Sequence, residues 1–195
     1  MRASKGASAL LALALALLSL TVSIAVPILC RPFYYVQIGA LNLPERTGWP
    51  AEVIREAYDQ VLDYCVFGAP FGTGALAWSE SGRSHFADVR GLFLLDFAVA
   101  GAAAAAVLVL FLLHRRRGLA FWAGTGTAAA VLLVAGLAAL DFDRAFTVFH
   151  AIFFPGKDNW IFDPATDQII LVMPEEFFRN CALLIGGVLL ACCAG

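Results

Sequence analysis

Four long apolar blocks constrain this chain more than any other feature of its sequence. They cover residues 8–29, 92–113, 119–140 and 177–195. Each has about the 20 residues that an α-helix needs to cross the hydrocarbon of a bilayer. Because lipid offers no hydrogen bonds, a span must satisfy its own backbone, which a helix does within one segment. The blocks therefore predict an all-α, polytopic membrane protein with four transmembrane helices.

The composition agrees with this class, and the length suits a single membrane domain over residues 1–195. Hydrophobic residues make up 61% of the chain and charged residues 14%, against about 45–50% and about 25% in soluble globular proteins. The first block exceeds the roughly 7–15 apolar residues of a signal peptide, and no convincing small-x-small cleavage site closes it. We therefore expect residues 8–29 to be retained as the first span.

Basic residues set the expected orientation of the spans. The short connection between the second and third blocks contains the cluster Arg115–Arg117, and the N-terminus carries two basic residues of its own. The long connections are acidic on balance, with five basic and seven acidic residues in 30–91 and three basic and seven acidic residues in 141–179. The positive-inside rule places both termini in the cytoplasm, and the connections 30–91 and 141–176 outside.

The outer connections have the patterns of helices rather than of linkers. Apolar residues recur at helical spacing over residues 50–66, where acidic side chains occupy another face and Pro50 suits the first helical position. Over residues 142–154, phenylalanines recur every three or four positions, as in helices that lie on a membrane surface. Pro174 and the two acidic residues after it are typical of a helix start. We expect extracytoplasmic helical cap segments.

Two histidines stand in these outer segments, each next to a predicted span. His150 lies among phenylalanines, and His85 precedes the second block. Imidazoles titrate near neutral pH, so two of them at similar depth are candidates for acid–base chemistry on a lipid-like substrate. The simpler alternative is that they anchor their helices at the headgroup layer. His114 belongs to the cytoplasmic arginine cluster, and we give it no role.

Asp96 lies inside the second block, near its outer end. If the helix begins near Ser84, its phase places His85 and Asp96 within about 20° of one face. A carboxylate at this depth is costly and usually faces protein or a wet cavity. Two interpretations therefore fit: Asp96 shares a polar face with His85, or it pairs with an arginine and locks two helices together.

Other functional classes lack their characteristic patterns. The five cysteines form no C-x-x-C pair, which argues against a thiol oxidoreductase and a structural zinc site. Cys30 and Cys65 are both expected outside, and nothing in their spacing decides whether they pair as a disulfide. The chain has no H-E-x-x-H, G-x-S-x-G or phosphate-binding loop. Nothing favours nucleic-acid binding, and two histidines without a patterned third ligand give poor support for a metal site.

Short stretches of the chain resemble the lipoprotein intramolecular transacylase family, a group of four-span bacterial membrane proteins. The resemblance is carried by Phe149–Phe154, Trp160–Asp163, Pro174–Phe178, Ser84–Arg90 and a helix ending in Tyr64. In layout it covers nearly the whole chain. One departure stands before His85, where Gly82–Ser84 replaces an expected acidic residue and Glu80 is displaced from that position.

The resemblance implies a reaction on diacylglyceryl-modified lipoproteins in the bacterial cell membrane, at its extracellular face. One acyl chain would move from the glycerol ester to the α-amino group of the lipoprotein's N-terminal cysteine. His150 would act as the principal base, and His85 as its partner, an acid or an oxyanion stabiliser. The candidates for orienting groups or substrate contacts are Asp88, Arg90, Trp160 and Asp163. No metal and no cofactor is implied.

The substrate would supply the nucleophile itself, so the protein needs no covalent nucleophile, although an acyl-enzyme route through Cys30 or Ser84 is the alternative. Two rival functions remain for the chain as a whole. In a non-enzymatic assembly or scaffold protein, the histidines would be interfacial anchors and the aromatic segments a partner-binding surface. In a lipid esterase or an acyltransferase with another acceptor, the same histidines would act on a different reaction.

Overall fold

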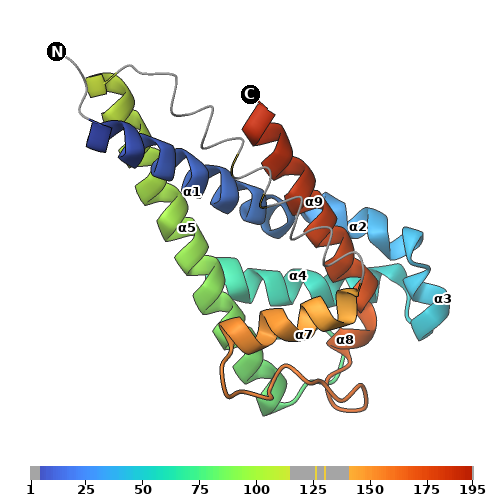
Figure 1. Cartoon of the computed structure of the whole chain (residues 1–195). Helices are drawn as coiled ribbons and strands as arrows, with labels where there is room; N and C mark the ends of the chain where they lie inside the picture. Colours follow the sequence, from blue (N-terminus) through green and yellow to red (C-terminus); the bar gives the residue numbers. More distant parts are fainter. Residues whose placement is uncertain (1–4, 115–125, 127–129, 131–140, 195) are drawn as a thin grey trace. The chain divides into compact units, whose positions relative to one another are not determined.

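The computed structural model of the chain describes residues 5–114, 126, 130 and 141–194 (Figure 1). This part of the chain contains helices and no strand, as the apolar blocks predict. Within it, three helical stretches are long and apolar enough to cross a membrane: Gly6–Leu29, Glu80–Leu112 and Glu175–Ala194. Apart from residues 126 and 130, the predicted third span and the Arg115–Arg117 cluster lie outside the described residues.

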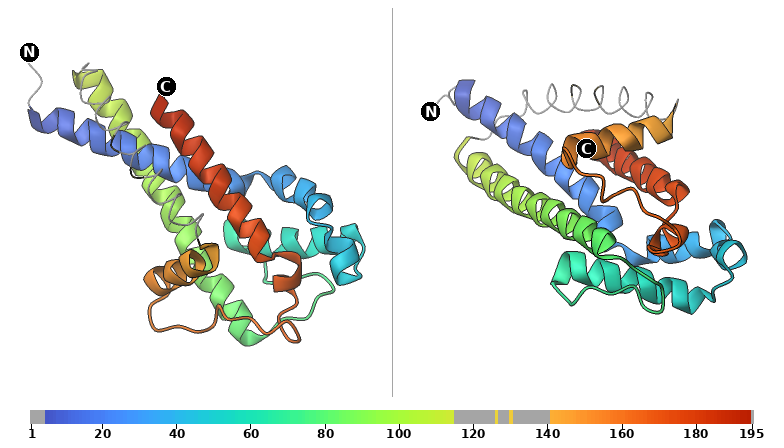
Figure 2. Two further views of the ribbon diagram at one scale, coloured as in Figure 1. Left: turned by 45° about the vertical axis from the view of Figure 1, so that its right-hand side comes forward. Right: turned by 90° about the horizontal axis from the view of Figure 1, so that it is seen from below.

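The chain divides into two compact units, whose helices Figure 2 shows from two further sides. The first unit comprises Met1–Val26, Leu95–Leu140 and Ala182–Gly195. It holds most of α1 (Lys5–Leu29), the second part of α5 (Glu80–His114) and most of α9 (Glu175–Ala194). The second unit comprises Pro27–Leu94 and Asp141–Cys181. It holds α2 (Arg31–Ala40), α3 (Leu43–Thr47), α4 (Ala51–Phe67), α7 (Phe142–Phe153) and α8 (Ile169–Val172).

In the first unit, polar side chains of the apolar helices are satisfied locally. The Thr21 hydroxyl donates to the Leu17 carbonyl at 2.9 Å, and the Ser23 hydroxyl donates to the Ser19 carbonyl at 2.6 Å. Such bonds to the preceding turn remove the cost of burying a hydroxyl. Asp96 differs, because one of its carboxylate oxygens is buried and accepts no hydrogen bond from any residue that the structure describes. The interpretation as an arginine pair therefore finds no partner among the described residues.

Helix α5 is longer than a bilayer requires. Its 35 residues extend about 52 Å at 1.5 Å per residue, whereas the hydrocarbon is about 30 Å thick. Four of its charged residues, Glu80, Arg83, Asp88 and Arg90, precede residue 92. We therefore treat residues 92–112 as the membrane-spanning part of α5. Residues 80–91 belong to the second unit, and we call them the outer extension because the charge pattern of the sequence predicts them outside.

In the second unit, α2, α3, α4 and α8 pack together (Figures 1 and 2). Helix α4 confirms the amphipathic pattern, since its apolar stripe is buried: Ile54, Ala57, Tyr58, Val61, Leu62 and Cys65. Pro50 is the residue before the helix rather than its first residue. Gly68 ends the helix in the left-handed region, at φ 76°, which glycine adopts without steric cost. Residues 31–47, for which the sequence predicted no helix, form α2 and α3.

Aromatic side chains form the centre of this packing. The ring of Tyr34 is fully buried and stacks on Tyr58, with 3.8 Å between the ring centroids. Phe177 meets Tyr34 edge-on at 5.2 Å. The Tyr34 hydroxyl donates to the Val172 carbonyl at 2.6 Å, which satisfies a polar group that burial would otherwise leave unpaired. This bond ties α2 to the end of α8, just before α9 begins.

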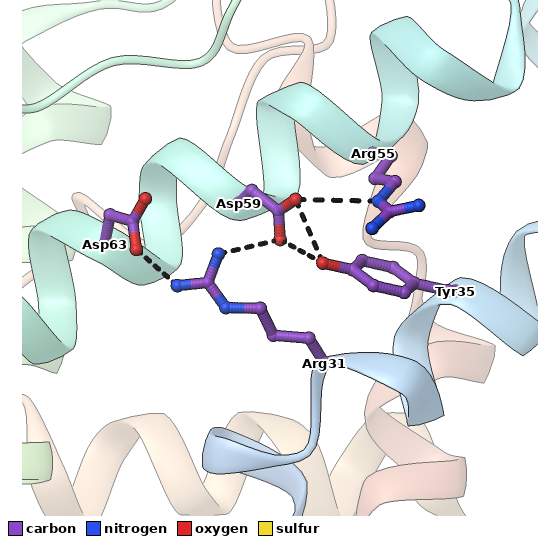
Figure 3. Close-up of polar contacts among 5 residues, drawn as sticks. All are labelled: Arg31, Tyr35, Arg55, Asp59 and Asp63. Carbon is purple, nitrogen blue, oxygen red and sulfur yellow. Dashed lines mark hydrogen bonds and ion pairs between the residues drawn. The ribbon is translucent and has the colours of Figure 1, made fainter.

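Five polar side chains, the Arg31 network, join α2 to α4 (Figure 3). Arg31 donates to Asp59 at 3.1 Å and also donates to Asp63. The Tyr35 hydroxyl donates to Asp59 at 2.8 Å. The Arg55 guanidinium lies 3.8 Å from the Asp59 carboxylate and 3.8 Å above the centre of the Tyr35 ring. Two guanidinium groups thus balance two carboxylates, and each of the five side chains has a partner within the network.

Candidate functional site

His150 is positioned by α7. The Asp141 side chain caps the start of this helix by accepting from the Arg144 N–H at 3.0 Å. His150 lies in the last turn, is buried, and its Nδ1 is 2.7 Å from the Phe146 carbonyl oxygen. Because a carbonyl only accepts hydrogen bonds, Nδ1 must carry the proton. In the neutral ring, Nε2 then has a free lone pair, as a general base needs.

His85 is buried in the outer extension of α5, beside His150. The centroids of the two imidazole rings are 5.8 Å apart, with 32° between the ring planes. The Nδ1 atom of His85 is buried and has no hydrogen-bond partner among the described residues. The structure therefore brings together the two histidines that the sequence singled out, from segments 65 residues apart in the chain.

Aromatic rings surround the two imidazoles. On His150, Trp160 stacks at 4.4 Å with 25° between the planes, and Phe146 lies at 4.2 Å. Phe154 contacts both histidines, at 5.0 Å from His85 and 5.6 Å from His150. Phe162 meets His85 edge-on at 5.5 Å. Such a shell excludes water and lowers the local dielectric constant, which strengthens polar interactions inside it.

Burial keeps both histidines neutral. Burial, together with the nearby His150, lowers the pKa of His85 to about 4, although Asp88 opposes the shift. Burial also lowers the pKa of His150, although the bond to the Phe146 carbonyl opposes this. At neutral pH both rings are therefore uncharged, so a lone pair is available for proton abstraction and an N–H for donation.

A polar clamp, formed by Asp88, Lys157 and Asn159, joins α5 to the segment after α7. The Lys157 ammonium donates to one oxygen of Asp88 at 2.5 Å, and the Asn159 amide nitrogen donates to the other at 3.1 Å. The bond from Lys157 lowers the pKa of Asp88, which stays ionised. Because the Trp160 indole donates to the Lys157 carbonyl at 3.1 Å, the clamp also holds the ring that stacks on His150.

Asp167 fastens a second part of the same segment to the start of α5. Its buried carboxylate accepts from the Ser79 N–H at 2.8 Å and from the Ser79 hydroxyl at 2.7 Å. Gly82 makes room for this arrangement, since a methyl group on Gly82 would overlap the Asp167 carboxylate. The same methyl group would lie 3.5 Å from Phe162, one wall of the histidine site.

The remaining predicted residues lie at different distances from the histidines. Trp160 and Asp88 belong to the site, as the stacking and the clamp described above show. The Arg90 guanidinium packs against the ring of Tyr64, 5.3 Å from its centroid. Asp163 is exposed, and its carboxylate accepts from the Ala165 N–H at 2.9 Å within a local turn. The structure does not bring Arg90 or Asp163 to the imidazole rings.

Sequence reasoning missed Lys157, Asn159 and Asp167. Lys157 and Asn159 lie shortly before Trp160, in a stretch that begins with Pro155 and Gly156 and has no hydrophobic periodicity. Their partner Asp88 is 69 residues away from Lys157 in the chain. The short charged run after Pro155 was the one available signal, and it did not indicate a partner.

Two cysteines in the second unit differ in their surroundings. Cys30 and Cys65 are both free thiols, Cys30 exposed and Cys65 buried. Burial raises the pKa of Cys65 to about 12, so this thiol is not ionised at neutral pH and is a poor nucleophile. Among the described residues, no group of three or more His, Cys, Asp and Glu side chains is placed to hold a metal ion.

Comparison with known proteins agrees with the family resemblance found in the sequence. Residues 9–178 match the sequence model of the family described as lipoprotein intramolecular transacylase Lit. The fold is similar to a solved structure of the membrane integral lipoprotein intramolecular transacylase Lit from Bacillus cereus, with a TM-score of 0.88, 24% identity, and coverage of 96% of this chain and 89% of that one.

Two variants of that Bacillus cereus protein, each with one histidine replaced, are similar as well. The arginine variant has a TM-score of 0.83, 23% identity, and coverage of 96% of this chain and 86% of its own. The alanine variant has the same TM-score and identity, and coverage of 96% and 87%. At these identities the likeness establishes the fold. No curated protein matches this chain.

Proposed function

Because this chain belongs to the lipoprotein intramolecular transacylase family, we propose that it transfers an acyl chain within the N-terminus of a lipoprotein. The substrate is a lipoprotein whose N-terminal cysteine carries a diacylglyceryl thioether. One acyl chain leaves its glycerol ester and becomes an amide on the α-amino group of the same cysteine. The product is a lyso-form lipoprotein with an acylated nitrogen and a free glycerol hydroxyl.

The observation that carries this proposal is the pair of neutral, buried histidines inside an aromatic shell. The reaction breaks the bond between the acyl carbonyl and the glycerol oxygen and forms a bond from that carbonyl to nitrogen. The nitrogen loses a proton, and the departing glycerol oxygen gains one. Two imidazole rings with centroids 5.8 Å apart can divide this work, one by moving the protons and the other by donating a hydrogen bond to the ester carbonyl oxygen, and the substrate itself supplies the nucleophile.

His150 is the base in this proposal. Its Nδ1 proton is held by the Phe146 carbonyl, so Nε2 is the atom that takes the proton from the attacking nitrogen. The resulting imidazolium then protonates the glycerol oxygen as the ester bond breaks. General acid–base catalysis of this kind contributes about 10²–10⁴-fold to the rate.

His85 acts as a neutral hydrogen-bond donor rather than as a proton carrier. Its pKa of about 4 makes protonation of the ring unfavourable at neutral pH. A neutral imidazole N–H can still stabilise the negative charge that develops on the ester carbonyl oxygen. The shell of Phe154, Phe162 and Trp160 excludes water, which would otherwise compete with the amine and turn the enzyme into an esterase.

The site works from the outer side of a bacterial cell membrane in this proposal, with both termini in the cytoplasm. We test this with single cysteines introduced at Asn42 and Asp158 in a Cys30→Ser background, probed with a membrane-impermeant thiol reagent on intact cells. Labelling without permeabilisation is expected. Labelling only after the cytoplasmic face is opened would reverse the topology and the location of the site.

The function itself is tested in a bacterium whose lipoproteins are diacylated and have a free α-amine. Expression of this protein should leave the total mass of the N-terminal lipopeptides unchanged, while fragmentation shows one acyl chain on nitrogen. An acyltransferase that uses a phospholipid donor would add the mass of one chain, and an esterase would remove it. Unchanged fragmentation in cells that contain the folded protein would favour the scaffold and contradict the proposal.

A further inference from the structure

Asn159 belongs to the polar clamp beside the histidine site. Its amide nitrogen has hydrogen-bond partners, but its amide oxygen has none among the described residues. Its nitrogen donates to the Asp88 carboxylate at 3.1 Å and reaches the Ser84 hydroxyl at 3.4 Å. These two partners flank His85 on the outer extension of α5, one residue before it and three residues after it. Trp160, the next residue in the chain, stacks on His150. Asn159 is thus held by residues that flank His85 in the chain, and it directly precedes the ring that covers His150.

The orientation of this amide follows from its partners. The two ends of an asparagine amide are hard to distinguish by shape, so the hydrogen bonds must decide. Asp88 is ionised and can only accept, and Lys157 donates to its other oxygen. The donor end of Asn159 therefore has to face Asp88, which directs Oδ1 away from the carboxylate.

Oδ1 of Asn159 is buried and accepts no hydrogen bond from any residue that the structure describes. Nδ1 of His85 is also buried and has no hydrogen-bond partner among the described residues. Buried polar atoms are nearly always paired, and exceptions need an explanation such as a bound ligand. Two unpaired atoms in this part of the molecule indicate a ligand whose polar groups complete the hydrogen bonds of both residues.

We propose that Oδ1 of Asn159 accepts a hydrogen bond from the α-amino group of the lipoprotein substrate and so positions the nitrogen for attack. This inference rests on the proposed function. With one N–H held by Asn159 and another directed to Nε2 of His150, the nitrogen lone pair is left free for the ester carbonyl. Fixing the reacting nitrogen in this way lowers the entropic cost of the transfer.

A neutral amide suits this position better than a carboxylate. A carboxylate would stabilise the protonated amine, which has no lone pair and cannot attack. The titratable and charged groups that flank Asn159 in its contacts and in the chain are Asp88 and His85 from α5, and Lys157 and Asp158 from its own segment. Lys157 balances the charge of Asp88, and Asp158 is exposed.

Two unreactive lipopeptides test the contact without any need for turnover. Both carry dialkyl ether chains in place of esters, and one lacks the α-amino group. Tryptophan fluorescence of the purified protein in lipid nanodiscs measures their affinities. The wild-type protein should bind the amine form more tightly. Asn159→Leu, which keeps the size of the side chain, should lower that preference about tenfold, the value of one good hydrogen bond, while the contact to Nε2 of His150 stays.

Lys157→Met is the matched control, because it weakens the polar clamp and leaves Oδ1 of Asn159 in place. It should retain the preference for the amine form. If Asn159→Leu kept the full preference, or if the wild-type protein had none, the proposal would be overturned, and Oδ1 would contact only water. If the preference were present but no acyl chain moved in cells, the amine site would stand and the proposed transacylation would fail.

An exchanged pair gives a second test that does not depend on folding of the leucine variant. Asp88→Asn combined with Asn159→Asp keeps one amide, one carboxylate and the hydrogen bond between them, but turns the charge towards the substrate. The acid limb of the kcat/KM profile should then move to higher pH by about one unit, because the amine is held in its protonated form. An unchanged profile with normal folding would mean that Asn159 serves only the clamp.

Discussion

The Arg31 network and the histidine site lie in the same unit of the protein, and they treat their polar groups in opposite ways. In the network, Arg31, Tyr35 and Arg55 give each of the two aspartates at least one hydrogen bond or ion pair (Figure 3). In the site, buried atoms of His85 and Asn159 find no partner in the described part of the chain.

This difference indicates that the Arg31 network supports the fold, whereas the histidine site binds a ligand. A polar cluster that satisfies itself stabilises the fold and has nothing to offer a ligand, whereas buried groups without partners lower stability and are retained where a substrate pairs with them. We therefore expect substitutions in the network to affect stability and substitutions in the site to affect turnover. Four experiments test this division.

The largest effect is expected from the histidines. His150→Ala removes the base and should lower turnover by about 10²–10⁴-fold, and His85→Ala should do the same, with both variants still folded. Mass spectrometry of lipopeptides from cells with matched protein levels measures the loss. His114→Ala, next to the Arg115–Arg117 cluster, is the control and should be fully active. Near-normal turnover of the His150 variant would contradict the mechanism.

The Arg31 network should show the opposite behaviour. Arg31→Met leaves two carboxylates without their shared cation and should reduce the free energy of unfolding by about 1–2 kcal/mol, while turnover per folded molecule stays within about threefold. Thermal unfolding in nanodiscs and lipopeptide assays measure the two quantities. Arg46→Met breaks the exposed pair with Glu176, and as the control it should cost less than about 1 kcal/mol. If Arg31→Met lost turnover but not stability, the division between a stabilising network and a reactive site would be wrong.

The stability of the protein should carry the signature of a buried neutral histidine. The folded-state pKa of His85 is about 4, below its ordinary value of 6.5. Between these two values the unfolded chain binds a proton that the folded protein does not, so stability falls as pH falls, by up to about 1.4 kcal/mol per pH unit. Above pH 6.5 this contribution vanishes.

His85→Phe removes the titrating group and fits the aromatic surroundings. Thermal unfolding between pH 4 and pH 7.5 should therefore give a shallower dependence on pH for this variant than for the wild-type protein. Parallel curves would show that His85 is as easily protonated in the folded protein as in water.

The smallest effect is expected at the rim of the site. Lys157 is nearly half exposed, so Lys157→Met should change stability by less than about 1 kcal/mol. Turnover should fall only a few-fold, mainly in kcat, because the ring of Trp160 is held less firmly over His150. Lys157→Arg keeps the pair with Asp88 and should restore the rate. A loss as large as that of His150→Ala would place Lys157 within the reaction itself.

Much of the fold could be predicted from the sequence, because hydrophobic periodicity is a local signal. The apolar stripe of α4, the aromatic repeat of α7 and the helix start after Pro174 all lie where their patterns indicate. Helix α2 was missed because its stability comes from distant residues. Tyr34 stacks on Tyr58 and donates to Val172, 138 residues further along the chain.

The site likewise contains residues that a local signal predicts and residues that only long-range contacts bring in. His85 and His150 were predicted because an imidazole next to a span is unusual in itself. The polar clamp was not, because Lys157 and Asn159 are ordinary surface residue types until α5 brings Asp88 to them. Asp163 was predicted from the family resemblance, but the structure uses its carboxylate in a local turn, and the buried acid of that segment is Asp167.

Gly82 cannot be replaced by a larger residue without a structural change, although its backbone conformation alone would permit one. It lies inside a helix in an ordinary conformation, where exchanging glycine for alanine usually stabilises a protein. Here the added methyl group would take the place occupied by the Asp167 carboxylate. An engineer who replaced the helical glycines of the described structure to make it more robust would, at Gly82, push away the carboxylate that fastens the segment after α7 to the start of α5.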